Sequence, residues 1–170
     1  MKSRISQSFE QLERDSKKAL IPFVMPGIPP GSDTLDLVLS LEDLGCNIVE
    51  IGIPFSDPIA DGPVIQRASS LALKQGFHTD RVFELASRIR CRSTIPLVLL
   101  AYYNCIFSYG VKDFIGCCIK SGVDGLIIPD LPFEERDEIN DFIRGVDIDV
   151  ITLAAPNSGS RLKKILPGAR

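Results

Sequence analysis

The chain has 170 residues, which is long enough for one domain with a substantial hydrophobic core. Its net charge of −3 and isoelectric point near 5.2 argue against a nucleic-acid-binding protein, which would usually carry a basic patch. No apolar stretch reaches the roughly 18 residues that a membrane-spanning helix needs, and residues 1–18 lack the apolar region of a signal peptide, so we expect a cytoplasmic protein.

Five short aliphatic segments are predicted to be β-strands. Their apolar residues run almost continuously, which is typical of strands that are buried on both faces of a parallel sheet. In chain order the segments are residues 19–25 (ALIPFVM), 47–53 (NIVEIGI), 96–103 (PLVLLAYY), 125–130 (GLIIPD) and 149–155 (DVITLAA).

Segments with the spacing of amphipathic helices lie before and between these strands. The positions of Ile5, Phe9 and Leu12 predict a helix ahead of the first strand, placed over one end of the sheet. The remaining helical segments are residues 32–45, 64–75, 80–91, 110–122 and 133–145. Strands and helices that alternate through short loops predict βαβ units and a parallel sheet.

Two α/β folds fit this alternation. A doubly wound sheet usually has a glycine-rich first turn, whereas the turn here, MPGIPPG (25–31), has prolines where N–H groups would face a phosphate. We therefore predict a (β/α)8 TIM barrel, which needs eight units and typically about 250 residues. The chain is expected to supply about the first five βα units of one domain, residues 1–170, with the C-terminal units missing.

The segment EIGIPFSDPIADGP, residues 50–63, is where we expect the chemistry. Strand alternation puts Ile48, Glu50 and Gly52 on one face and their aliphatic neighbours on the other. Glu50 would then point into the barrel near its C-terminal mouth, where barrel active sites lie. An apolar environment there should raise its pKa, which suits a general acid/base near neutral pH.

The following loop, residues 54–63, begins and ends with proline, which limits its freedom, so it can hold Asp61 close to Glu50. Two carboxylates in unlike environments can divide the work, one titrating and the other staying ionised. The alternative is structural: Glu50 is a buried residue with satisfied hydrogen bonds, and Asp57 and Asp61 are turn formers or helix caps. The residues alone favour neither interpretation.

A resemblance to a known family separates them. VEIGIPFSDPIADGPVIQ (49–66) is similar to the signature of the tryptophan synthase alpha chain family. IPFVMPG, LLAYYN, GVDGLIIPDLP and LAAPN resemble that family's first, third, fourth and fifth strands, in the same order. The resemblance covers essentially the whole chain. It implies a TIM-barrel lyase of tryptophan biosynthesis that splits indole-3-glycerol phosphate into indole and glyceraldehyde 3-phosphate.

The resemblance also implies roles for individual residues. Glu50 matches the catalytic acid/base, and Asp61 matches a second acid that accepts the indole N–H. Phe23, Leu100 and Ile127 match the positions that pack against the indole plane, and Tyr102 lies beside them at the mouth of the substrate site. Ordinary barrel core is the alternative for these four. The phosphate-binding turns are expected on later strands, beyond this chain.

A partner is implied as well, namely a beta chain that carries pyridoxal phosphate (PLP) in an α2β2 heterotetramer, with no cofactor in this chain. Asp57, Pro58 and Asn104 match its contact surface. Ile28 departs from the family, which often has an acidic residue there. Two other readings remain open: a non-catalytic regulatory subunit that activates a PLP-dependent beta chain, and a barrel acting on another sugar phosphate.

A metal site is not expected. His78 is the only histidine, and the five cysteines show no zinc-binding spacing. We interpret the cysteines as reduced thiols, most of them small buried apolar groups.

Overall fold

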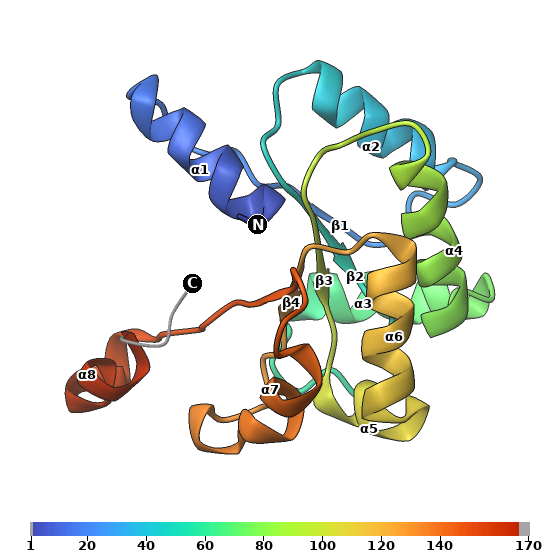
Figure 1. Ribbon diagram of the computed structural model, residues 1–170. Helices are drawn as coiled ribbons and strands as arrows, with labels where there is room; N and C mark the ends of the chain where they lie inside the picture. Colours follow the sequence, from blue (N-terminus) through green and yellow to red (C-terminus); the bar gives the residue numbers. More distant parts are fainter. Residues whose placement is uncertain (1, 167–170) are drawn as a thin grey trace.

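Five parallel strands form a single sheet in the order β1-β2-β3-β4-β5 (Figure 1). The computed structural model describes residues 2–166, so the ends of the predicted domain, residues 1 and 167–170, lie outside the described part. Each strand lies within a segment predicted from the sequence, although its hydrogen-bonded part is shorter. The strands are β1 (Phe23–Val24), β2 (Val49–Gly52), β3 (Leu97–Leu100), β4 (Gly125–Ile127) and β5 (Asp149–Val150).

This strand order decides between the two α/β folds. In a doubly wound sheet the order of the strands reverses at a switch point, whereas here every strand pairs with the next one along the chain. Successive parallel strands of this kind are the wall of a (β/α)8 barrel, and the chain supplies five of its βα units. The predicted fold is confirmed.

A helix follows every strand. Two α-helices follow each of β2 and β3, and a short 3₁₀ helix (η) precedes the α-helix after β4 and after β5. α5 was not predicted, because its first residue, Tyr103, lies at the end of a segment predicted to be a strand. The side chain of Asp130, beyond β4, accepts the N–H of Tyr103 at 2.7 Å and fixes the start of this helix. The helices are α1 (Arg4–Arg14), α2 (Thr34–Asp43), α3 (Pro63–Lys74), α4 (Thr79–Arg90), α5 (Tyr103–Tyr109), α6 (Val111–Ser121), η1 (Phe133–Glu135), α7 (Asp137–Ile143), η2 (Pro156–Arg161) and α8 (Leu162–Ile165).

The two faces of the sheet differ as the alternation in β2 predicts. Val49 and Ile51 are completely buried, and Ile53 nearly so, in the main core between the sheet and the helices. In Figure 1, α2, α4 and α6 lie along this side of the sheet, and each of these helices contacts the next. Ile48 belongs instead to a second, smaller cluster with Ile5 on the opposite, concave side.

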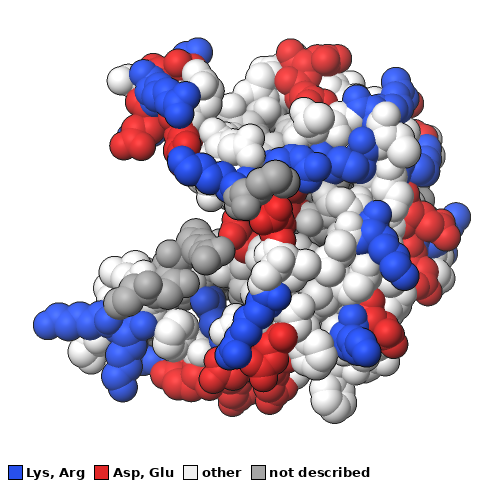
Figure 2. Space-filling model, in the orientation of Figure 1, with Lys and Arg blue, Asp and Glu red and all other residues white. Residues whose placement is uncertain are grey.

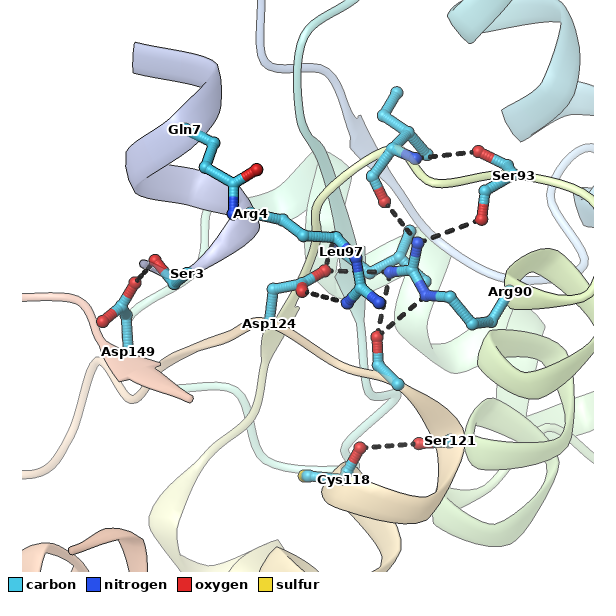
Figure 3. Close-up of polar contacts among 12 residues, drawn as sticks. Ser3, Arg4, Gln7, Arg90, Ser93, Leu97, Cys118, Ser121, Asp124 and Asp149 are labelled. Atoms are coloured by element: carbon cyan, nitrogen blue, oxygen red, sulfur yellow. Dashed lines mark hydrogen bonds and ion pairs between the residues drawn. The ribbon is translucent and has the colours of Figure 1, made fainter. Parts of the chain in front are cut away.

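Helix α1 closes the N-terminal end of the sheet, as predicted. Ser3 caps the helix by accepting the N–H of Ser6, and its hydroxyl also donates to Asp149 at the start of β5 (Figure 3). Ile5 and Leu12 are buried, but Phe9, the third residue of the predicted apolar face, is 47% exposed. Within residues 2–166, no helix has both the length and the apolar character needed to cross a bilayer.

Candidate active site

Glu50 lies in the middle of β2 on the concave face of the sheet. It is in register with Phe23 of β1 on one side and with Val98 of β3 on the other. The side chain borders a largely apolar cavity of about 520 Å³ between α1 and the sheet, together with Ile5 and Ile127. Figure 2 shows that the molecule is hollowed between α1 and the segment that contains α8.

The surroundings of Glu50 favour its protonated form. The carboxyl is half-buried, and this loss of solvent raises its pKa above the ordinary value. The negative charge of Asp61 raises the pKa further. No hydrogen-bond donor among residues 2–166 offsets these two influences. The structural alternative required a glutamate whose hydrogen bonds are satisfied, so this environment argues against it.

Asp61 lies in the loop between β2 and α3, and it does not cap the helix. The residue at the N-cap of α3 is Gly62, and no side chain caps the first turn. The N–H of Asp61 closes a turn by donating to the carbonyl of Pro58 at 3.1 Å. The loop thus holds the partly buried Asp61 near enough for its charge to act on Glu50.

The three residues predicted to pack against the indole plane gather near Glu50. Leu100 of β3 and Ile127 of β4 are in register with Gly52 of β2, so all three share the concave face one layer closer to the mouth. Phe23 crosses from β1 over Gly52, where a Cβ atom would lie only 2.7 Å from the phenylalanine ring. These partly buried side chains form an apolar wall beside a single carboxyl group, which is the usual design of a small-ligand site.

Gly52 is a site residue whose role sequence reasoning missed. Strand alternation predicts that it lies on the concave face but does not explain why that position holds a glycine. A glycine inside a strand often marks a place where another group approaches closely, and here the group is the Phe23 ring. That rule was the available signal.

Tyr102 is placed differently from the other three residues. It is only 2% exposed, and its hydroxyl oxygen accepts the N–H of Ala60 at 3.0 Å. Its ring also packs on Phe55, with the ring centroids 5.3 Å apart. Burial raises the pKa of Tyr102, and the charge of the nearby Asp61 raises it further. Tyr102 therefore holds the loop that carries Asp61.

The predicted partner-contact residues lie around the same mouth of the sheet. Asp57, in the loop after β2, and Asn104, in α5 after β3, are exposed. Pro58 is buried, so it shapes the loop and presents little surface of its own. On the face seen in Figure 2, acidic and basic side chains are interspersed, without the basic patch of a nucleic-acid-binding surface.

The described residues offer neither a metal site nor a disulfide. Across residues 2–166, no three histidine, cysteine or acidic side chains lie close enough together to hold a metal ion. All five cysteines are free: Cys46 and Cys118 are buried, Cys105 and Cys117 are partly buried, and Cys91 is exposed.

Comparisons with known proteins point to one family. Residues 9–170 match the family model described as tryptophan synthase alpha chain. A protein of that name from Alkaliphilus metalliredigens is 48% identical over 169 residues, which cover 99% of this chain and 64% of the relative. One from Caldanaerobacter subterraneus subsp. tengcongensis is 48% identical over 163 residues, covering 96% and 62%.

Solved structures agree. The crystal structure of tryptophan synthase subunit alpha from Legionella pneumophila superposes with a TM-score of 0.94 at 34% identity, covering 100% of this chain and 66% of that one. A chain in the tryptophan synthase α2β2 complex of Pyrococcus furiosus gives a TM-score of 0.81 at 41% identity, covering 89% and 64%. This chain thus spans just under two thirds of the length of these relatives.

Proposed function

The chain belongs to the tryptophan synthase alpha chain family, and from this membership we propose that it is part of a carbon–carbon lyase of tryptophan biosynthesis. The substrate is indole-3-glycerol phosphate and the products are indole and glyceraldehyde 3-phosphate. One observation carries the proposal: Glu50 is a half-buried carboxyl on the concave face, bordering an apolar cavity, and both burial and the charge of Asp61 raise its pKa. We also propose that residues 1–170 belong to a single barrel domain.

Glu50 acts as the general acid/base of a retro-aldol cleavage. It delivers a proton to the indole ring carbon that bears the glycerol side chain and takes the proton from the adjacent hydroxyl group. The bond between the ring and the side chain then breaks, leaving indole and an aldehyde, with no net gain or loss of protons. A carboxyl whose pKa is raised toward neutrality can both give and take the proton.

Asp61 accepts a hydrogen bond from the indole N–H and stabilises the positive charge that develops on the protonated ring. Phe23, Leu100 and Ile127 pack against the flat ring system and keep it in line with Glu50. Tyr102 contributes by fixing the loop that carries Asp61, since its hydroxyl is already engaged by Ala60.

The partner we propose is a beta chain in an α2β2 assembly, as in the Pyrococcus furiosus complex. The beta chain would carry PLP and use the indole, so this chain needs no cofactor of its own. Asp57 and Asn104 are exposed at the mouth through which indole would leave, and Pro58 shapes the loop that carries Asp57. The five free thiols support a reducing compartment, and we place the protein in the cytoplasm.

The test is indole release from indole-3-glycerol phosphate by the complete natural protein that contains these residues. Glu50→Gln keeps the shape of the side chain but cannot exchange a proton, so activity should fall at least about a hundredfold. Glu84→Gln is the matched control, because it neutralises an exposed carboxylate on α4, on the other side of the sheet. Its activity should equal that of the wild type.

Adding a beta chain separates the alternatives. If the wild-type protein makes no indole but still raises the turnover of the beta chain, the regulatory-subunit reading replaces the lyase. If Glu50→Gln releases indole at the wild-type rate, the role assigned to Glu50 is wrong. Inactivity in both assays would overturn the proposed function as a whole.

A further inference from the structure

Ser69 is a buried serine of α3 whose hydroxyl serves the neighbouring loop. Its Oγ accepts the N–H of Phe55 at 2.8 Å and donates to the carbonyl of Phe55, also at 2.8 Å. Both backbone polar groups of one loop residue are thus satisfied by the hydroxyl of a residue that is 2% exposed. A serine inside a helix usually bonds back to its own helix. Ser87 and Ser121 do so here, through the carbonyls of Phe83 and Cys117.

The other end of this loop is anchored by Tyr102. Its hydroxyl accepts the N–H of Ala60, the residue just before Asp61. Tyr102 is itself held in place because it is the N-cap residue of α5, whose first N–H donates to Asp130. The rings of Phe55 and Tyr102 are in contact, so the two anchors support each other.

Between the anchors the loop is mostly exposed, and Pro58 is its buried residue. Ser56, Asp57 and Ile59 are exposed, and Ile59 is 83% exposed. Without the two hydroxyl groups, the position of Asp61 would depend on this turn and on one hydrogen bond of 3.0 Å from an α3 side chain to the Asp61 carbonyl. A displacement of about 1 Å in a reacting or stabilising group can cost a hundredfold in rate.

We infer that Ser69 is a positioning residue that works with Tyr102 to brace residues 55–61, so that Asp61 stays beside Glu50 and beneath the indole. The inference rests on the proposed function for its kinetic consequence, whereas the bracing itself concerns only this chain. Removing the Ser69 hydroxyl leaves the N–H and carbonyl of Phe55 unpaired in a partly buried site. The loop then loses the hydrogen bonds that favour its present conformation, and other conformations become accessible.

The titration of Glu50 reports directly on the position of Asp61, because the charge of Asp61 raises the pKa of Glu50. Asp61→Asn removes that charge and sets the expected direction, a lower pKa for Glu50. Glu10 of α1 and Asp149 of β5 also border the cavity around Glu50, and neither contacts Ser69. A change of the Glu50 pKa in Ser69→Ala therefore comes from the loop.

The experiment follows the Glu50 carboxyl by carbon-13 NMR in the complete protein, with the signal assigned through Glu50→Gln. Ser69→Ala should lower the pKa of Glu50 in the direction set by Asp61→Asn, and Ser69→Thr, which keeps a hydroxyl, should restore it. Ser121→Ala is the control, since it removes an equally buried helix hydroxyl that does not contact the loop. In the indole assay, Ser69→Ala should lower kcat about tenfold with KM changed less than about twofold.

Tyr102→Phe provides a second route if Ser69→Ala fails to fold. It removes the other anchoring hydroxyl, keeps the ring, and should lower the pKa of Glu50 in the same direction. The inference is overturned if the pKa of Glu50 in Ser69→Ala equals that in the wild type. If Ser69→Ala does not fold, the same result in Tyr102→Phe overturns it. Because the titration needs no substrate, it gives this answer even if the wild-type protein makes no indole, an outcome that would count only against the proposed function.

Discussion

Arg90 and Asp124 form a buried ion pair at the N-terminal end of the sheet, with 2.8 Å between Nη2 and Oδ2 and side chains 16% and 3% exposed (Figure 3). The Asp124 carboxylate also accepts hydrogen bonds from Nη1 of Arg4 at 2.6 Å and from the N–H of Leu97 at 2.8 Å. One side chain thus joins α1, α4 and the start of β3. The network lies at the end of the strands away from the mouth, where barrel residues serve stability.

Asp124→Asn should therefore destabilise the protein without altering the chemistry. The change removes the charge that compensates a buried guanidinium, and breaking a buried pair in this way costs about 3 kcal/mol of unfolding free energy. Urea unfolding measures the loss. Asp36→Asn is the control, because its contact with Arg92 is 3.8 Å long and exposed, and such pairs contribute little. Equal losses in the two variants would contradict the role given to Asp124.

Gly52→Ala should disturb the apolar wall beside Glu50. The added methyl group would lie 2.7 Å from the Phe23 ring and 3.0 Å from Cε of Met25, so the ring, which is assigned to the indole wall, must shift. We expect a loss of about 1–3 kcal/mol in unfolding free energy and a higher KM for the substrate. Thermal unfolding and the indole assay measure the two effects.

The matched control for this change is Gly116→Ala in the middle of α6. A Cβ atom there meets nothing within 4 Å, and the backbone is helical. Replacing a glycine by alanine inside a helix should stabilise the protein by about 0.5–1 kcal/mol. If Gly52→Ala behaves like Gly116→Ala, the packing of Phe23 over Gly52 does not constrain the site.

Sequence patterns predicted the strands and the direction of Glu50, because alternation in a strand needs only local residues. What they missed depends on distant contacts. The predicted strand 96–103 stops early because Asp130, 27 residues further on, binds the N–H of Tyr103. Tyr102 anchors Ala60, 42 residues before it, and so lies under the loop. The resemblance to the family matched Pro58 to a contact surface, and its burial follows only from the folded turn.

The last prediction concerns how stability depends on pH. The carboxyl of Glu50 has an ordinary pKa of 4.5 in the unfolded chain and a raised pKa in the folded protein, because of burial and the charge of Asp61. Between these two values the folded state binds more protons than the unfolded state. The contribution of Glu50 to stability is therefore complete below pH 4.5 and is lost as the pH rises through the folded pKa.

Glu50→Gln has no carboxyl to titrate at this position. The difference in free energy of unfolding, variant minus wild type, should therefore rise as the pH rises from 4.5, and this gap should level off above the folded pKa of Glu50. Urea unfolding of both proteins across this range measures the gap. In an Asp61→Asn background the rise should be smaller and should end at lower pH, because one cause of the raised pKa is gone. A gap that stays constant with pH would mean that Glu50 titrates normally, and the carboxyl would then be poorly suited to acid/base catalysis near neutral pH.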